Sequence, residues 1–313
     1  MPTSDELTAK IKVLNERIWE DRARMPIIDA WLSNFTGKST TEDAERTHAL
    51  HILAHFMYFG SRETRALLRS LFKEAYRYPI LESIRRANGD TLDRCLINMH
   101  FTAELRATRF LGIGNPAESG THLLYYFRQE NGLPKDLFIN PHQIFSRTAT
   151  GTTLRTPTVK RYVFLDDMCG SGHQAEEYSQ DIVSELKRLA PSAHAAYYVL
   201  FATTRALNNI RANTLFDDVN CIFDLDPSFV CFGDTSRYFS KNDPDINKDT
   251  ARDMCLHYGR ELWPEHPLGY DDCQLLLGFH HNTPDNTVPV IWYDEPGSPW
   301  HAMFKRYPKL TLW

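Results

Sequence analysis

The sequence predicts an α/β protein with a mostly parallel sheet, preceded by a helical region at its N-terminus. Three observations support this fold class. Apolar residues recur at helical spacing through the first 100 residues. From about residue 107, short apolar runs alternate with helical stretches. The clearest of these runs, 161–165, leads into a glycine-containing loop and a helix. We therefore expect a helical region over 1–105 and an α/β domain over 106–313.

Composition restricts the class of protein. Of the 313 residues, 42% are hydrophobic and 24% are charged, and the mean hydropathy is −0.43, which is ordinary for a globular protein. No apolar run approaches the roughly 18 residues that a membrane span needs, and no secretory signal begins the chain. The six cysteines are dispersed without a CxxC pair, which favours reduced thiols over a zinc site. We expect a cytoplasmic protein with no membrane contact.

The charge distribution argues against a general affinity for nucleic acid. The net charge is −5, so there is no overall basic field. Residues 1–100 carry 15 Lys and Arg against 14 Asp and Glu. Within them, Arg62, Arg65 and Arg69 fall on one predicted helix face. Such a face is most simply solvated, and the alternative is contact with a polyanion. We predict that 1–105 serves assembly or resembles a helix-turn-helix module.

The first helix of this region is indicated by apolar residues at positions 7, 11, 14 and 18. A second helix follows Thr41 and is expected to end at Gly60. A third is expected to begin near Ser61, and a fourth covers about 91–106. Beyond these helices, the α/β pattern predicts six strands. They are expected over 110–114, 137–139, 161–165, 196–201, 219–223 and 275–279.

The most informative segment runs from Val163 to Gln174. A buried strand is followed by Asp166 and Asp167, then by the loop Gly170-Ser171-Gly172, then by a helix. In open α/β sheets, ligands bind beyond the carboxyl ends of the strands. Carboxylates there accept hydrogen bonds from sugar hydroxyls or hold a magnesium ion. A helix N-terminus behind a glycine loop suits phosphate. The segment predicts a site for ribose 5-phosphate.

The segment also matches parts of other patterns. The pattern Gly170-x-Gly172-x-x-Ala175 matches a dinucleotide fingerprint, but the next strand has no acid at its end to hold the ribose. A Walker A loop needs Gly-Lys-Ser/Thr, and His173 stands in place of that lysine. A solvated strand end followed by a capped helix stays open as an interpretation without a ligand.

A second junction follows the strand expected at 110–114. It suggests an anion loop for a pyrophosphate or a nucleotide phosphate, formed by Gly114, Asn115, Glu118, Ser119 and Gly120. A simple turn with an N-cap from Ser119 explains the same residues equally well.

A third junction follows the strand expected at 275–279. It suggests a loop that closes over the ligand, formed by His281, Asn282, Thr283 and Asn286. Residues of these types usually form an ordinary turn. Metal binding by His280 and His281 is disfavoured because no nearby Cys or His has suitable spacing.

The segment around Asp166 resembles the phosphoribosyl-pyrophosphate motif of type I phosphoribosyltransferases, although that family usually has two threonines where this chain has Gly170 and Ser171. The resemblance implies the parallel sheet of that family, with Asp166 and Asp167 as the catalytic pair facing the ribose hydroxyls. It also implies a Mg²⁺ ion at the two aspartates. The 5-phosphate would be wrapped by Cys169, Gly170, Ser171, Gly172, His173 and Gln174.

A longer pattern resembles a bacterial phosphoribosyltransferase-like subgroup of conflict systems, some members of which are effectors of retron antiphage systems. The pattern comprises 114–120, the Asp-Asp loop, 236–239 and 281–287. This resemblance implies a toxic enzyme that acts on phosphoribosyl pyrophosphate or a nucleotide by transfer or hydrolysis. Its partners would be a reverse transcriptase and its small DNA, and assembly into an oligomer is left open. Glu176 and Glu177 depart from a phosphate-binding helix start, so a catalytically inactive sensing or regulatory module is the alternative.

Overall fold

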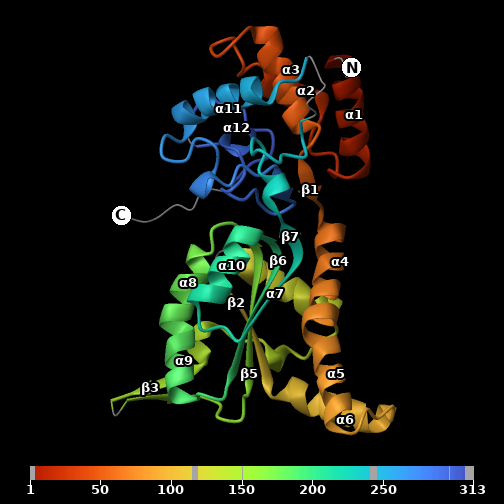
Figure 1. Cartoon of the computed structure of the whole chain (residues 1–313), viewed down its shortest axis with the longest axis vertical. Helices are drawn as coiled ribbons and strands as arrows, with labels where there is room; N and C mark the ends of the chain where they lie inside the picture. The colour runs from red at the N-terminus through yellow and green to blue at the C-terminus, as the bar shows by residue number, and fades with distance from the viewer. Residues whose placement is uncertain (1–3, 115–118, 150, 240–244, 296, 307–313) are drawn as a thin grey trace. The chain divides into compact units, whose positions relative to one another are not determined.

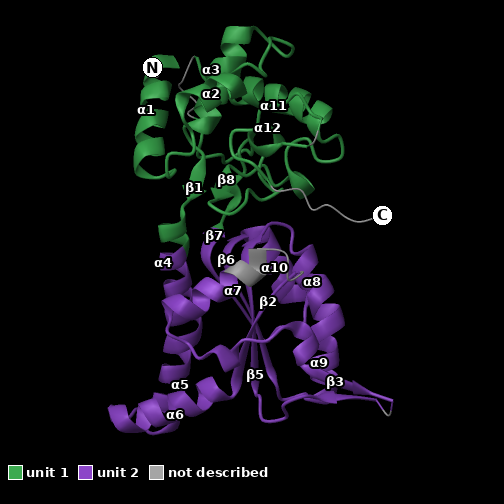
Figure 2. Cartoon of the chain, turned by 180° about the vertical axis from the view of Figure 1, so that it is seen from behind, with its two compact units in different colours: residues 1–64, 225–313 green, residues 65–224 purple. Residues whose placement is uncertain are grey.

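The computed structural model describes residues 4–114, 119–149, 151–239, 245–295 and 297–306. The chain divides into two compact units (Figure 2): unit 1 comprises residues 1–64 and 225–313, and unit 2 comprises residues 65–224. This division differs from the boundary expected after residue 105. The helices before that boundary pack on the sheet through contacts such as Tyr76 with Phe110, whereas α11 from the C-terminal segment packs on α3.

Unit 1 is mainly helical (Figure 1). Its α-helices are α1 (Ser4–Arg17), α2 (Met25–Leu32), α3 (Glu42–Leu53), α11 (Lys248–Leu262) and α12 (Pro289–Trp292), and its 3₁₀ turns are η5 (Pro227–Phe229) and η6 (Tyr270–Asp272). Two short strands, β1 (Met57–Phe59) and β8 (Leu277–Phe279), pair in parallel. The helix expected to reach Gly60 therefore ends at Leu53, and the strand expected at 275–279 pairs with β1, outside the main sheet.

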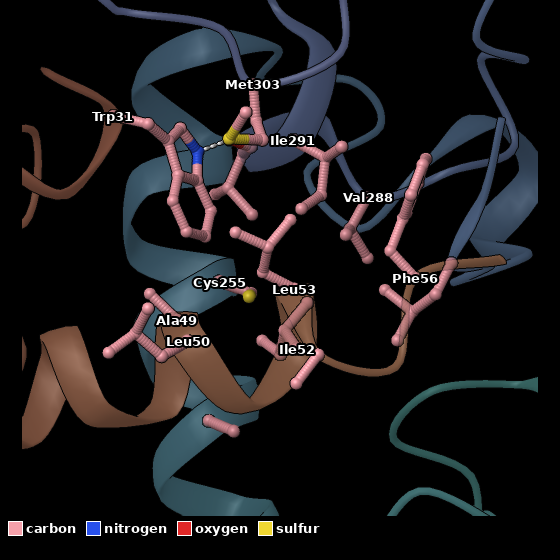
Figure 3. Packing of buried hydrophobic residues seen from close by; sticks show 14 of the residues in the cluster. Trp31, Ala49, Leu50, Ile52, Leu53, Phe56, Cys255, Val288, Ile291 and Met303 are labelled. Carbon is pink, nitrogen blue, oxygen red and sulfur yellow. Dashed lines mark hydrogen bonds between the residues drawn. The ribbon is translucent and has the colours of Figure 1, made fainter. Parts of the chain in front are cut away.

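The core of unit 1 joins the two ends of the chain (Figure 3). Trp31, Leu53 and Ile291 are each at most 1% exposed, and the Trp31 indole donates to the Val290 carbonyl at 2.7 Å. Gly259 of α11 permits a close approach, because a Cβ atom there would lie 1.9 Å from the Pro267 carbonyl oxygen. Residues distant in sequence thus complete one core, which a sequence pattern alone does not reveal.

Glu45 of α3 is a buried charge with internal partners. Its carboxylate is fully buried. It accepts hydrogen bonds from the backbone N–H groups of Gly37 (2.7 Å) and Ser39 (2.6 Å) and from the Tyr258 hydroxyl (2.6 Å). A buried carboxylate is tolerated when donors replace water in this way. Glu45 therefore fixes the segment between α2 and α3 and ties it to α11.

Unit 2 contains the main sheet, with helices on both of its faces (Figure 1). Its strands are β2 (Thr108–Gly112), β5 (Arg161–Cys169), β6 (His194–Thr203) and β7 (Asp218–Leu225), and a separate antiparallel hairpin is formed by β3 (Phe145–Thr148) and β4 (Gly151–Leu154). Its helical segments are most of α4 (Ser61–Leu71), the π-helix η1 (Phe72–Arg77), α5 (Tyr78–Ala87), α6 (Arg94–Arg106), α7 (Ser119–Glu130), η2 (Lys135–Leu137), η3 (Pro141–Gln143), α8 (His173–Tyr178), the π-helix η4 (Ser179–Val183), α9 (Ser184–Leu189) and α10 (Thr204–Asn213).

The order of strands in the main sheet is β2-β5-β6-β7, and both β2 and β6 run parallel to β5. One face packs against residues of α8, η4, α9 and α10, including Ala175, Val183 and Ile210. The other face places Phe110 against Phe72, Tyr76 and Phe127, which come from η1 and α7. The expected α/β class with a mainly parallel sheet and a helical N-terminal region is confirmed.

The predicted strands of this sheet are present, and most are longer than expected. The run predicted at 161–165 extends to Cys169, and the run predicted at 196–201 covers His194–Thr203. The exception is 137–139, where the structure has only an isolated parallel bridge from Phe138 to Phe110. Within the described ranges, no helix combines the length and the apolar composition that crossing a bilayer requires.

Candidate functional site

Asp166 and Asp167 lie within β5, three and two residues before its end. Their exposed fractions are 7% and 9%, so both side chains are buried rather than placed at a solvated strand end. The reason is the length of the pairing, since β5 stays in register with β6 as far as Cys169 and Ala202. The two acids therefore belong to the interior of the carboxyl half of the sheet.

The Asp166 carboxyl group is held by internal donors. Its Oδ1 accepts from the Asp167 backbone N–H at 2.9 Å, and its Oδ2 accepts from the Tyr197 hydroxyl of β6 at 3.0 Å. Burial and then the neighbouring Asp167 carboxyl group raise the pKa of Asp166 well above its ordinary value. The two carboxyl groups also interact directly. The buried acid pair is therefore harder to ionise than two exposed aspartates.

The loop after β5 has the conformation that its glycines allow. Gly172 has φ +93° and immediately precedes α8, a backbone region that side-chain-bearing residues rarely adopt. The Thr203 hydroxyl donates to the Gly170 carbonyl at 2.6 Å and accepts from the Ala206 N–H at 3.0 Å. Thr203 thus joins the loop to the start of α10, the helix after the neighbouring strand.

Three residues of the expected phosphate-wrapping segment lie near the first turn of α8. Ser171 is partly buried, whereas His173 and Gln174 are exposed; the Ser171 hydroxyl accepts from the His173 N–H at 3.4 Å. Glu176, which would compete with phosphate for this helix start, accepts a hydrogen bond from Asn209 of α10. This contact engages the Glu176 carboxylate with the neighbouring helix.

The loop after β2 lies beside the acid pair. Because β2 and β5 are parallel neighbours, their carboxyl ends share one edge, and the Ile113 N–H donates to the Leu165 carbonyl at 3.0 Å. Gly114 has φ +94°, and its carbonyl accepts from the Tyr178 hydroxyl at 3.0 Å. Of the predicted second anion loop, Asn115 and Glu118 lie outside the described residues, and Ser119 and Gly120 begin α7.

The predicted closing loop lies in unit 1. Thr283 is 1% exposed and Asn286 is 6% exposed. The Thr283 hydroxyl donates to the Phe304 carbonyl at 3.1 Å, and Asn282 accepts from the Phe279 N–H at 2.9 Å. The His281 ring stacks on Phe279. The segment is thus packed into the core of unit 1 and shares no compact unit with Asp166; a role in closure stays a prediction.

Two of the three arginines on α4 have a partner within unit 2. Arg65 and Arg69 both form salt bridges with Glu130 of α7, and the Arg65 guanidinium lies 4.1 Å from the centre of the Tyr126 ring. This arrangement gives the two arginines an internal structural role. Solvation of this helix face and contact with a polyanion both stay predictions.

The acid pair has the donor atoms that a Mg²⁺ site uses. Two carboxylates suit this ion when substrate phosphate oxygens and water complete its six ligands. Across the ranges that the structure describes, no group of three or more His, Cys, Asp or Glu side chains could hold a metal alone. The donor set therefore fits a Mg²⁺ ion that arrives with a phosphorylated substrate. Because carboxylates bind a metal ion in their ionised form, the raised pKa of Asp166 would make this binding weaker at low pH.

Sequence reasoning missed three residues that position the site: Tyr178, Tyr197 and Thr203. Tyr197 and Tyr198 look alike in the sequence, and their hydroxyls contact different acids, Asp166 and Asp218. Only Thr203 carried a usable signal, because a threonine between a strand and a helix is a typical N-cap. The second contact of Thr203, with the Gly170 carbonyl, could not be predicted because it depends on β6 lying next to β5.

Comparison with known proteins places this architecture in a family. The sequence model of the family described as PRTase-CE matches residues 28–306, which is most of the chain. This chain belongs to the PRTase-CE family. The resemblance to phosphoribosyltransferase-like proteins is thereby confirmed. The Asp166 pair and the Gly172 loop of this PRTase-CE chain both lie inside the matched range. No curated protein matches the chain.

Among solved structures, the chain is similar to a xanthine-guanine-hypoxanthine phosphoribosyltransferase from Helicobacter pylori. The identity is 11%, the match covers 53% of this chain and 85% of the other, and the TM-score is 0.30. It is also similar to an orotate phosphoribosyltransferase from Aeropyrum pernix. There the identity is 13%, the coverage is 50% and 76%, and the TM-score is 0.25.

Proposed function

We propose that this chain is a cytoplasmic phosphoribosyltransferase-like enzyme that binds phosphoribosyl pyrophosphate or a nucleotide in unit 2. One observation carries the proposal: a buried, interacting pair of carboxyl groups on β5 is followed, a few residues on, by a left-handed glycine that begins a helix. Asp166 and Asp167 accept hydrogen bonds from the two ribose hydroxyls. The backbone N–H groups of 169–174 bind the 5-phosphate, which the positive end of the helix dipole favours.

The reaction in this proposal breaks a bond at the anomeric carbon of the ribose, by transfer or by hydrolysis. Asp166 and Asp167 orient the sugar through its hydroxyls, so that the bond that breaks is held in one place. Tyr197 and Thr203 keep the acid and the loop in position. Asp166 and Asp167 would hold a Mg²⁺ ion that arrives with the substrate, and that ion would offset the negative charge of a departing diphosphate.

Turnover by the full-length protein tests the proposal. The protein is incubated with phosphoribosyl pyrophosphate and Mg²⁺, and the released pyrophosphate is measured. We expect the double variant Asp166→Asn, Asp167→Asn to lose at least about 100-fold in rate, a typical loss when preorganised polar groups are removed. Asp218→Asn is the matched control, because Asp218 is also an acid of this sheet with a tyrosine partner. Equal rates for the double variant and the control would place the active site elsewhere.

The second candidate function is a catalytically inactive module that senses a ligand or regulates a partner on the same fold. The engagement of both Asp166 oxygens by internal donors favours it, since these oxygens must exchange partners to meet a sugar. This candidate predicts that ribose 5-phosphate binds without any product from phosphoribosyl pyrophosphate. Binding together with turnover would eliminate it.

We further propose that the enzyme is a toxic effector of a retron-type antiphage system, restrained by a reverse transcriptase and its small DNA. The resemblance of 114–120, 236–239 and 281–287 to that subgroup supports this role. We expect expression of the protein alone to arrest bacterial growth, and the Asp166→Asn, Asp167→Asn variant to be harmless at the same protein level. Equal toxicity of the variant would separate toxicity from this site. Co-purification with the neighbouring gene products tests the partner and any oligomer.

A further inference from the structure

A cavity lies near the amino ends of β2 and β5, within unit 2, and its volume is about 180 Å³. Arg109 of β2 and Tyr162 of β5 line it side by side, because the two residues are register partners in the parallel pair. Asp166 is four positions further along β5, about 13 Å away at the usual rise of a strand. The fully buried Phe164 lies between Tyr162 and Asp166 on the same strand face. The cavity is therefore separate from the proposed sugar-phosphate site.

Two further segments complete the wall and are fixed in place before any ligand binds. The first surrounds η2 and η3, and the second follows β4. In the first segment, the Ile139 N–H donates to the Phe110 carbonyl of β2 at 3.1 Å. The Arg155 N–H of the second segment donates to the Ile144 carbonyl of the first at 2.9 Å. A preorganised wall of this kind lowers the entropy cost of binding.

Tyr162 provides a buried polar group without a partner. The residue is 1% exposed, yet its hydroxyl forms no hydrogen bond with any residue that the structure describes. Buried hydroxyls are normally paired. Because Tyr162 lines the cavity, a ligand there is the partner that its hydroxyl lacks. Burial raises the pKa of Tyr162, so the hydroxyl keeps its proton at neutral pH and donates a hydrogen bond.

The charged side chains of the wall leave one net positive charge. Arg109 and Arg155 contribute two positive charges, and Asp136 contributes one negative charge. Neither arginine forms a salt bridge within the described ranges of the chain. An arginine binds a carboxylate through two parallel hydrogen bonds. A single carboxylate balances the net charge, whereas a phosphate dianion would exceed it and would be repelled by Asp136.

The remainder of the wall favours an apolar body on the same ligand. Ile139, Ile144 and Val159 line the cavity, together with the Tyr162 ring. An apolar protein cavity of about 150 Å³ is large enough to bind benzene, and this one, at about 180 Å³, is slightly larger. An apolar wall with a few placed polar groups is the usual form of a small-molecule site.

We infer that this cavity binds a small organic monocarboxylate whose apolar body is about the size of a benzene ring. Arg109 and Arg155 attract the carboxylate, and the Tyr162 hydroxyl donates a hydrogen bond to it. Ile139, Ile144 and Val159 contact the body. The site is additional to the proposed sugar-phosphate site and does not depend on the proposed function.

Ligand-observed NMR on the full-length protein tests the inference, with benzoate as the probe and benzamide as its uncharged match. We expect saturable transfer to benzoate and at least about tenfold weaker binding of benzamide, because only benzoate forms charge-assisted hydrogen bonds. No transfer to benzoate, or equal affinity for the two probes, overturns the inference. Displacement of benzoate by an equal concentration of inorganic phosphate overturns the assignment to a monocarboxylate.

Two variants test the groups that hold the carboxylate. Tyr162→Phe removes a hydroxyl that bonds to no described residue, so hydrogen exchange of β5 peptides should stay unchanged while the affinity for benzoate falls about tenfold. Arg155→Gln should weaken benzoate by a similar factor. Arg147→Gln is the matched control, because Arg147 lies on β3 of the adjacent hairpin and its side chain is 73% exposed; it should bind benzoate as wild type does. Unchanged affinity in Tyr162→Phe and Arg155→Gln overturns the inference.

Ribose 5-phosphate separates this cavity from the proposed sugar-phosphate site. Benzoate should stay bound in the presence of ribose 5-phosphate, and the Asp166→Asn, Asp167→Asn variant should bind benzoate with wild-type affinity. Loss of benzoate in either experiment would place the probe at the acid pair and overturn the inference. If benzoate binds and ribose 5-phosphate does not, the sugar-phosphate site fails and the carboxylate site stands.

Discussion

The stability of Asp166 variants tests whether the buried acid pair carries a proton. Asp166→Ala removes the acceptor of two buried donors, the Tyr197 hydroxyl and the Asp167 N–H. Leaving one buried donor without a partner costs about 1–3 kcal/mol. The variant should therefore lose about 2–6 kcal/mol from the stability of unit 2, a large share of the roughly 5–15 kcal/mol of a typical domain.

Asp166→Asn should behave differently, because an amide resembles the protonated acid. Its oxygen still accepts from the Asp167 N–H, and its NH₂ group donates to the Tyr197 hydroxyl, which is able to accept. The sign of the pH effect follows from the raised pKa of Asp166. The unfolded acid ionises at about pH 4 and the folded acid only at higher pH. The contribution of Asp166 to the stability of unit 2 is therefore fully present below about pH 4 and is lost as the pH rises towards the folded pKa of this group. The side chain in Asp166→Asn does not ionise, so the stability of this variant should not fall over the same pH range.

Two probes separate the units in this experiment, which is run with a chelator to exclude metal ions. All six tryptophans lie in unit 1, so their fluorescence in urea reports unit 1 and should not change. Hydrogen exchange of peptides from β5 and β6 reports unit 2. At pH 7 we expect Asp166→Asn to protect these peptides at least as well as wild type, and Asp166→Ala to protect them much less. Equal losses in the two variants would refute a protonated Asp166.

Three further results are expected. Glu45→Ala should destabilise unit 1 by about 3–5 kcal/mol in urea followed by tryptophan fluorescence, because it leaves several donors of the 37–40 segment and Tyr258 without an acceptor; a loss below about 1 kcal/mol would contradict this. Burial lowers the pKa of His51 from 6.5 to about 4, so the contribution of His51 to the stability of unit 1 should be fully present above pH 6.5 and fall by about 3 kcal/mol towards pH 4. His51→Gln should flatten this dependence of stability on pH, and parallel curves for the variant and wild type would contradict it. Arg65→Ala with Arg69→Ala should leave the nucleic acid content of the purified protein unchanged, because Glu130 already engages both side chains; a lower ratio of absorbance at 260 to 280 nm would reveal a polyanion contact.

The sequence predicted what local patterns determine. The run before Asp166, the loop and the helix are set by neighbours along the chain, so the strand-loop-helix unit of β5 and α8 could be read directly. The ends of β5 could not, because its last residues are strand only through pairing with β6. That pairing also buries Asp166 and Asp167, which the sequence analysis had placed after the end of the strand.

Contacts between distant residues were beyond the sequence. Tyr197 and Thr203 reach Asp166 and Gly170 only because β6 lies next to β5. The units themselves show the same effect, since α11 and β8 complete a core begun by α3 and β1. One chain cannot reveal that its first 64 residues need its last 89 as packing partners.

Calorimetric titration of ribose 5-phosphate into the full-length protein tests the central claim most directly. Gly172→Val introduces a side chain where φ is +93°, next to the backbone N–H groups that we propose bind the phosphate. Gly89→Val is the matched control, because Gly89 also has a positive φ, +65°, and a Cβ atom there meets nothing within 4 Å. We predict that wild type and Gly89→Val bind equally and that Gly172→Val binds at least about tenfold more weakly, a difference of about 1.4 kcal/mol. Equal affinity of Gly172→Val and wild type would contradict a phosphate site at this loop.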